Sequence, residues 1–90
     1  MKYNLFKTNQ FKRTYKKLKL SDSQEEMFID VVYKLLNGIE LEKKYKDHTL
    51  TGNYSNYREC HLKTDILLIY QYSQNLLKLV DIGSHSSLFD

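Results

Sequence analysis

Two runs of apolar residues at helical spacing open the chain. Between residues 8 and 20, Phe11, Tyr15 and Leu18 recur at intervals of four and three residues, which places them on one face of a helix. The cations of this stretch fall mostly outside that face. We therefore predict a first helix that is amphipathic and basic.

A second helix is predicted from residue 21 to residue 36. Ser21 and Gln24 are spaced as a capping box, in which the serine hydroxyl and the glutamine side chain each accept a backbone N–H of the other residue. The helical period then continues through Met27, Phe28, Val31, Val32, Leu35 and Leu36. Asn37 and Gly38 follow, and both residue types tolerate the left-handed backbone that ends many helices. The two helices are expected to form a hairpin joined near residue 20.

The second half of the chain has the pattern of strands. Residues 57–62, 66–72 and 76–82 have the length and composition of strands and are separated by short polar breaks, which predicts an antiparallel meander. The middle run is apolar on both faces, so it is expected inside the sheet with helices covering one side. Residues 2–6 are expected to form a further short strand. These elements predict an α+β fold of the single domain 1–90, with two N-terminal helices packed on a four-stranded, mainly antiparallel sheet.

Residues 39–57 follow neither period and are rich in loop-forming residues. A connection of this length is usually either functional or disordered. Three tyrosines, Tyr45, Tyr54 and Tyr57, make it too apolar for disorder. We therefore expect an ordered, functional loop.

Composition narrows the class of protein. Ninety residues, of which 41% are hydrophobic, suffice for one small core. The single cysteine excludes a disulfide framework and a multi-cysteine zinc site. The longest apolar run, residues 66–70, is far too short to span a bilayer, and residues 1–7 do not resemble a secretory signal. We expect a cytoplasmic protein without a membrane partner.

The charge is distributed unevenly along the chain. The net charge is only +3, but residues 1–20 contain seven cations and no acid, whereas residues 21–42 contain six acids and one lysine. Such a dipolar molecule presents a candidate surface for a phosphate backbone. The candidates for an RNA- or ribosome-facing surface are Lys12, Arg13, Lys16 and Lys17. The alternative is a solvated helix face without a partner.

Three histidines, His48, His61 and His85, are candidates for proton transfer because histidine can act as base or acid near neutral pH. Strand alternation places Glu59 and His61 on one face and Cys60 on the other. Asp65, in a break between two strands, is a candidate base or orienting residue, or an aspartate that caps its own turn. These ligand types permit a zinc site, but no compact metal motif is present, so we expect no metal and no cofactor.

Cleavage of a phosphodiester by attack of the 2′-hydroxyl suits this set of residues. The reaction needs a base for the 2′-OH, an acid for the leaving 5′-oxygen and donors or cations on the phosphoryl oxygens. Histidines and a carboxylate on a basic surface supply these without a metal. Phe89 and the tyrosines Tyr45, Tyr54 and Tyr57 are candidates to stack on an unpaired base.

Several spaced motifs make the resemblance to a known family specific. They are YKDHTLTG at 45–52, YRECHLKTD at 57–65, LIY at 68–70 and GSHSSLF at 83–89. Together they resemble the YafQ branch of the RelE/ParE toxin superfamily. The resemblance implies a bacterial type II toxin that cleaves mRNA, commonly at the ribosome, and is silenced by a cognate antitoxin.

The same motifs imply roles for individual residues. His48, His61, Asp65 and His85 match catalytic positions, with His85 as general acid or proton shuttle. Phe89 is expected to shape the substrate pocket.

Two positions depart from the family pattern. Asp81 stands where relatives often have an arginine suited to the phosphoryl group, so we expect weakened cleavage or a relocated cation, with Arg58, Lys46 or Lys63 as the substrate-binding replacement. Ile66 stands where some relatives have tryptophan, so one stacking surface is expected to be missing.

Two other functions are alternatives to a nuclease toxin. One is an RNA- or ribosome-binding inhibitor of translation with weak or lost nuclease activity. The other, a gyrase-directed toxin of the ParE type, is disfavoured because that branch does not need the three histidines. We expect the antitoxin to cover the basic surface with acidic residues.

Overall fold

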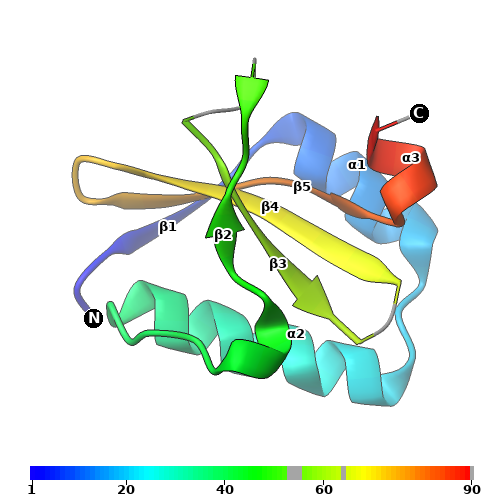
Figure 1. The fold of residues 1–90 in the computed structure, drawn as a ribbon, viewed down its shortest axis with the longest axis horizontal. Coiled ribbons are helices and arrows are strands. Elements are labelled where there is room, and N and C mark those ends of the chain that lie inside the picture. The colour runs from blue at the N-terminus through cyan, green and yellow to red at the C-terminus, as the bar shows by residue number, and fades with distance from the viewer. Residues whose placement is uncertain (53–55, 64, 90) are drawn as a thin grey trace.

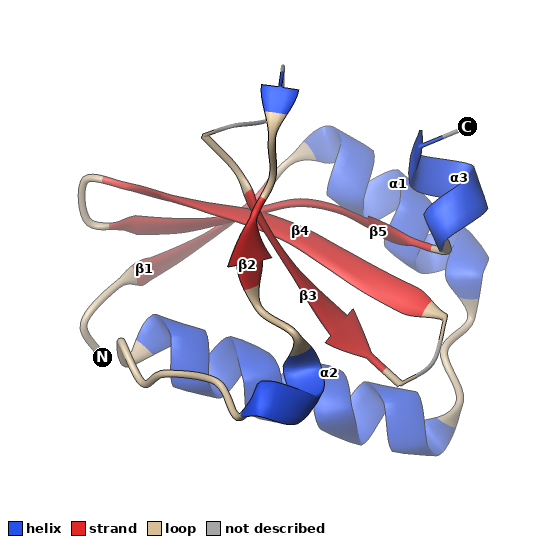
Figure 2. Cartoon of the chain, in the orientation of Figure 1, coloured by secondary structure: helices blue, strands red, loops and turns tan. Residues whose placement is uncertain are grey.

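A computed structural model of the chain describes residues 1–52, 56–63 and 65–89, without the side chain of Phe89. Figure 2 distinguishes its helices from its strands; along the chain one strand precedes α1 and α2, and a short helix follows the last strand. The helices are α1 (Asn9–Leu18), α2 (Asp22–Leu36), the short 3₁₀ helix η1 (Lys43–Tyr45) and α3 (His85–Phe89). The strands are β1 (Asn4–Lys7), β2 (His48–Thr49), β3 (Arg58–Leu62), β4 (Ile66–Ser73) and β5 (Leu76–Gly83).

The strands of the described chain form one mixed sheet in the order β1-β5-β4-β3-β2. The meander from β3 to β5 is antiparallel, as the sequence predicts, and β4 lies at its centre. The predicted number of four strands is one too few, whereas the sheet is mainly antiparallel, as expected. A fifth strand, β2, pairs antiparallel with β3, and β1 runs parallel to β5. Two-residue strands such as β2 are too short to produce a pattern in the sequence.

The helix boundaries agree closely with the expected ones because their caps form as predicted. Ser21 Oγ accepts the backbone N–H of Gln24 at 3.2 Å, and Gln24 Oε1 accepts that of Ser21 at 2.9 Å. Gly38 follows α2 with a φ of +68°, which is the left-handed region that favours glycine. At the start of α1, Thr8 Oγ1 accepts the N–H of Phe11.

Helices α1 and α2 cover one face of the sheet and leave the other largely to α3 and the loops (Figure 1). The core lies between the two helices and the alternate residues of β3, β4 and β5 that face them. Among the most deeply buried side chains are Phe11, Val31, Cys60, Leu62, Leu68, Leu77 and Leu79. Tyr15 of α1 joins the two helices, because its hydroxyl donates to Glu25 of α2 at 2.6 and 2.7 Å.

A β-bulge separates the two ends of β5. Ile69 pairs with Asp81 while Tyr70 pairs with Leu79, so Val80 is the extra residue. Thr8 Oγ1 donates to the carbonyl of Val80 at 2.8 Å, which fastens the start of α1 to the bulge. The bulge changes which β5 side chains face the helices, so regular alternation does not carry through this strand.

The chain leaves the extended path of β5 after Gly83. A short helix begins at His85, with Ser84 Oγ accepting the backbone N–H of Ser87 at 3.2 Å. Strand alternation continued past Gly83 would place His85 on the same face as Asp81, and the helix removes that relation. Among the described residues, no helix is long and apolar enough to cross a membrane.

Candidate functional site

The pairing of β2 with β3 brings two histidines to one carboxylate. In the register of these strands His48 lies opposite Glu59, and His61 follows Glu59 by two residues on the same face of β3. Oε1 of Glu59 lies 3.6 Å from Nε2 of His48 and 3.5 Å from Nε2 of His61. The two imidazole rings have centroids 6.4 Å apart. This histidine pair with its shared acid lies on the sheet face opposite α1 and α2.

Glu59 is the buried member of the group. It is 6% exposed, whereas the side chains of His48 and His61 are 51% and 28% exposed. A buried carboxylate is costly unless charged or hydrogen-bonding groups compensate it. Each ring can offer it an N–H when Nε2 carries a proton. The arrangement therefore sets one nitrogen of each partly accessible ring beside a buried acid.

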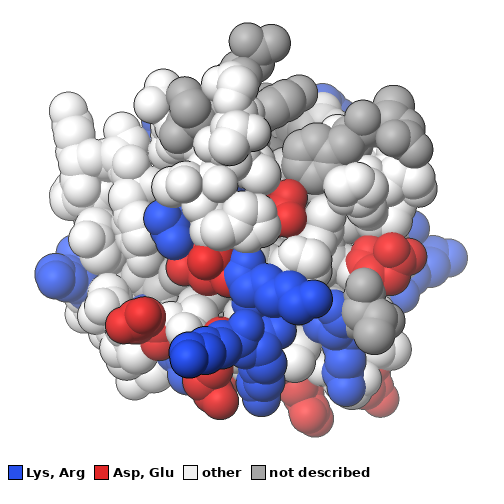
Figure 3. All heavy atoms as spheres, viewed as in Figure 1, with Lys and Arg blue, Asp and Glu red and all other residues white. Residues whose placement is uncertain are grey.

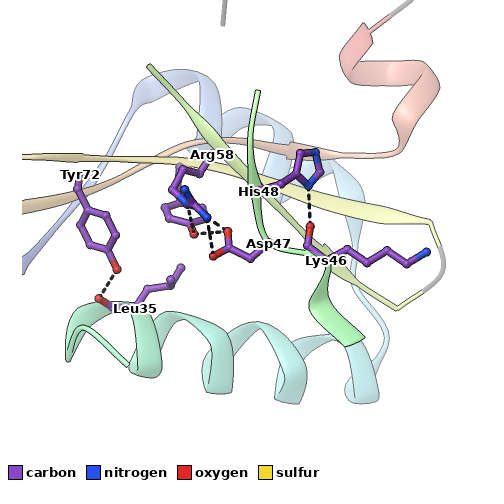
Figure 4. Close-up of polar contacts among 7 residues, drawn as sticks. Leu35, Lys46, Asp47, His48, Arg58 and Tyr72 are labelled. Carbon is purple, nitrogen blue, oxygen red and sulfur yellow. Dashed lines mark hydrogen bonds and ion pairs between the residues drawn. The ribbon is translucent and has the colours of Figure 1, made fainter. Parts of the chain in front are cut away.

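The backbone fixes the orientation of His48. Its Nδ1 lies 2.7 Å from the carbonyl oxygen of Lys46, as Figure 4 shows. Because a carbonyl can only accept, Nδ1 carries a hydrogen and donates it. In the neutral ring Nε2 is then the acceptor nitrogen. That nitrogen can take a proton from a bound molecule and share it with Glu59.

The loop before His48 is ordered by a buried aromatic. Tyr45 is 3% exposed, and its hydroxyl donates to Asp30 of α2 at 3.3 Å. Tyr45 thus packs this part of the connection onto α2, which corrects the suggestion that Tyr45 stacks on a base, while a functional role of the loop stays a prediction. Tyr54 lies outside the described residues, and Tyr57 is partly exposed. Of the candidates for stacking in this loop, Tyr57 is thus the described residue that keeps an accessible side chain.

A second charged cluster lies on the helix-covered side of β3. Asp47 accepts hydrogen bonds from the Tyr70 hydroxyl and from Nε and Nη2 of Arg58, the latter at 3.1 Å (Figure 4). The bond to Asp47 raises the pKa of Arg58. Burial, followed by the bond to Asp47, raises the pKa of Tyr70. We call this group the Asp47 clamp; it joins the residue before His48 to β3 and β4.

The Asp47 clamp includes Arg58, which the sequence predicted as a substrate-binding residue. Arg58 is committed to Asp47 and Tyr70, and strand alternation directs it away from the face that carries His61. Its substrate-binding role stays a prediction. Cys60, two residues along the same face, is fully buried, and burial raises the pKa of its thiol, which suits a packing residue.

His85 follows a row of paired residues that crosses three strands of the sheet. His61 pairs with Leu67, and Leu67 pairs with Gly83, two residues before His85. With strands spaced about 4.8 Å apart, Gly83 is roughly 10 Å from His61 along this row. His85 is exposed at the start of α3, and this helix ends at Phe89, whose side chain lies outside the described part of the chain. The structure thus places Gly83, two residues before His85, in the same row as His61, and the ion pairs of Glu59 among the described residues are with His48 and His61.

Asp65 and Asp81 have different environments. Asp65 is exposed in the turn before β4, and no hydrogen bond or ion pair among the described residues involves it. Asp81 is engaged, because its Oδ1 accepts from the Thr14 hydroxyl and from the N–H of Ile82, both at 2.8 Å. At the position where an arginine was expected, this chain therefore has an acid that ties β5 to α1.

The predicted cations occupy two separate regions. Lys46 and Lys63 lie beside His61 in a depression of about 300 Å³ that Lys44 and Met27 also line. The cations of α1 are exposed on a helix that packs on β5; they are Lys12, Arg13, Lys16 and Lys17. Neither Glu59 nor Lys44 was predicted as a site residue from the sequence. Strand alternation places Glu59 on the same face as His61, and this pattern could have indicated Glu59 as a site residue.

The comparisons with known proteins agree with this fold. Residues 3–90 match the family described as bacterial toxin of type II toxin-antitoxin system, YafQ. The mRNA interferase toxin YafQ of Escherichia coli K12 is 40% identical over 53 residues, which are 59% of this chain and 58% of that protein. The chain spans roughly half the length of the curated relatives that it matches.

Two solved structures are similar over nearly the whole chain. A copper-bound mutant toxin from Helicobacter pylori is 32% identical with a TM-score of 0.88, covering 97% of this chain and 99% of that one. The toxin in the DinJ-YafQ complex from E. coli is 27% identical with a TM-score of 0.86, covering 98% and 99%. With the family match over residues 3–90, these likenesses show that the chain belongs to the YafQ family of bacterial type II toxins.

Proposed function

We propose that this protein is the toxin of a bacterial type II toxin–antitoxin system and an endoribonuclease that cleaves mRNA at the ribosome. The observation that carries the proposal is the buried Glu59 shared by two accessible histidines beside a cluster of lysines. The name mRNA interferase given to the E. coli relative supports the same substrate.

The geometry supports a division of labour in the reaction. Nε2 of His48 or His61 takes the proton of the RNA 2′-hydroxyl, and Glu59 holds the resulting imidazolium. The 2′-oxygen then bonds to phosphorus, the bond from phosphorus to the 5′-oxygen breaks, and an acid protonates that oxygen. His85, across the row from His61, is the proposed acid, and Asp65 assists in orienting the histidines. The products are a 2′,3′-cyclic phosphate and a free 5′-hydroxyl.

The mechanism proposed here needs no metal. Imidazole and carboxylate groups are ligand types that bind divalent metals, and the H. pylori mutant toxin is copper-bound. In the described part of this chain, however, no group of three or more such side chains is arranged to hold a metal ion. The Nε2 atoms of both histidines are directed at one oxygen of Glu59, as in ion pairs, and no step is derived through a metal.

The partners are proposed from the relatives and the charge pattern. The E. coli relative was solved in a complex with DinJ, and we propose a cognate antitoxin for this chain as well. The accessible lysines and arginine favour an antitoxin segment rich in acidic residues. Cytoplasmic action, on mRNA and without a membrane partner, follows from the same proposal.

Cleavage of a short single-stranded RNA by the purified protein tests the function. The wild type should cut the RNA with and without a chelator, and an RNA with a 2′-deoxy sugar at the cut site should stay intact. His85→Ala should lower the rate, whereas the neighbouring variant Ser86→Ala should not. Loss of cutting with the chelator, or full activity of His85→Ala, would contradict the mechanism.

A second candidate is an RNA- or ribosome-binding inhibitor with little or no nuclease activity. Asp81 favours it, because this acid is fixed by Thr14 and Ile82 and supplies no cation near the end of β5. Growth arrest without RNA cutting, unaffected by His85→Ala, would favour this candidate. Asp81→Arg should raise cleavage if the acid weakens a nuclease.

A further inference from the structure

Three lysines line the depression beside His61. They are Lys44 of η1, Lys46 after it and Lys63 after β3, and His61 and Met27 of α2 complete the lining. Among the described residues, no acid lines it. Figure 3 shows Lys and Arg side chains gathered on the face that carries η1 and β2. Since His61 also contacts Glu59, the depression adjoins the proposed reaction centre directly.

The three lysines differ from Lys34 in their contacts with acids. None of the ion pairs found among the described residues involves them. By contrast, Lys34 pairs with both Asp30 and Glu42 at 3.1 and 3.3 Å. Ammonium groups around one small depression repel one another, so an anion placed among them is stabilised by all three. A tetrahedral phosphate group is an anion of suitable size and charge.

The chain holds these lysines in place at a conformational cost. Lys46 and Lys63 have φ values of +49° and +66°, a left-handed backbone that side-chain-bearing residues rarely adopt. Strain of this kind gathers at functional sites. The ammonium of Lys44 lies 5.2 Å from the ring centre of buried Tyr45, a cation–π contact that limits its range. Glycine or asparagine would relieve the strain, and lysine is present instead.

We propose that Lys44, Lys46, Lys63 and His61 bind a phosphate of the RNA chain that neighbours the phosphate being cleaved. The inference rests on the proposed nuclease function and adds to it a subsite that sets the register of the RNA. Contacts to backbone phosphates fix position without reading sequence. Lys44, which no motif indicated, is then a substrate-binding residue.

Inorganic phosphate is the first probe, because it reports on the subsite without cleavage. The ring signals of His61 in the NMR spectrum should shift as phosphate is added to the wild type. The double variant Lys44→Ala/Lys63→Gly should lose this response, and glycine at position 63 relieves the left-handed strain, so the variant is expected to fold. Lys43→Ala is the matched control, since Lys43 precedes Lys44 but does not line the depression.

Binding of a non-cleavable RNA with a 2′-deoxy sugar at the cut site is the second probe. Each lost phosphate contact lowers the salt dependence of binding to single strands, with a change in logarithmic slope of about 0.7. The double variant should show this decrease and Lys43→Ala should not. An unchanged phosphate response and salt slope in the folded double variant would overturn the subsite. Intact phosphate and RNA responses in a wild type that cuts no RNA would instead support the subsite and overturn the nuclease.

Discussion

Two acids on opposite faces of the sheet, Glu59 and Asp47, each contact two partners, but the partners differ in kind. On the open face, Glu59 lies between the imidazoles of His48 and His61. On the helix-covered face, Asp47 accepts from Arg58 and Tyr70. Histidine gains and loses a proton near neutral pH, whereas arginine stays charged and a phenol stays neutral. The open face therefore carries the residue types used in proton transfer, whereas the covered face carries a fixed ion pair and a neutral phenol.

The two clusters meet at the short strand β2. Asp47 and His48 are consecutive, so the Asp47 clamp fixes the backbone from which the His48 side chain projects. The carbonyl of Lys46 on the other side of Asp47 fixes the ring itself. A rigid ion pair on one side of the sheet thus positions a titratable group on the other. The substitutions Glu59→Gln and Asp47→Asn test the difference between the two faces, because each replaces a carboxylate by an amide of the same shape.

Glu59→Gln should have the largest effect, and it should be on catalysis. The amide keeps the shape of the side chain but cannot neutralise an imidazolium, so RNA cleavage is expected to fall about 10²-fold or more, within the range of positioned acid–base catalysis. The pH profile of cleavage should change as well, because the proton acceptor loses its charged partner. Initial rates on a defined RNA across neutral pH measure both effects, with urea denaturation as the control for folding.

Asp47→Asn should lower the stability of the fold more than the rate of RNA cleavage, which is the opposite of Glu59→Gln. The asparagine leaves Arg58 and Tyr70 without their charged acceptor, which is expected to lower the free energy of unfolding by about 1–3 kcal/mol. Cleavage by the folded fraction should fall less than tenfold, because no proton is transferred on that face. Urea denaturation and single-turnover cleavage measure the two quantities. If Asp47→Asn lost as much cleavage as Glu59→Gln, the division between the faces would be wrong.

Much of this architecture follows from local patterns in the sequence. The capping box at Ser21, the helical stripes and the apolar run in β4 depend on neighbouring residues, so they predicted the helices and the antiparallel meander. The pairing of β1 with β5 joins residues more than 70 positions apart. No local period encodes such a contact. The β2 strand and the bulge at Val80 likewise involve tertiary contacts. At the bulge, the contact is the hydrogen bond from the Thr8 hydroxyl to the carbonyl of Val80.

The candidate site was predictable in part for the same reason. The motifs indicated His48, His61 and His85, and strand alternation placed Glu59 with His61. The meeting of His48 with Glu59 required the register of β2 on β3, which becomes visible only in the fold. Arg58 was selected for its charge alone. Strand alternation already placed Arg58 on the face opposite His61, but its partner Asp47 could not be read from residue types.

Tyr72→Phe should give the smallest effect and extends the comparison to alkaline pH. The Tyr72 hydroxyl donates to the carbonyl of Leu35 at 2.7 Å and so joins β4 to α2 on the covered face (Figure 4). Burial, followed by the neighbouring Tyr3, raises the pKa of Tyr72 to about 12. At neutral pH the loss of this bond is expected to lower the free energy of unfolding by about 0.5–1.5 kcal/mol.

The pH dependence of this variant follows from the raised pKa. Below the ordinary tyrosine value of about 10 the phenol is neutral in both folded and unfolded chains, so its contribution is fully present. Between pH 10 and about 12 the unfolded chain ionises first, and the contribution is lost as pH rises. Thermal melts of the wild type and Tyr72→Phe should therefore converge over this window. A constant difference between the two melting curves would show that the bond to Leu35 does not depend on the phenolic proton, and that the covered face owes its stability to packing instead.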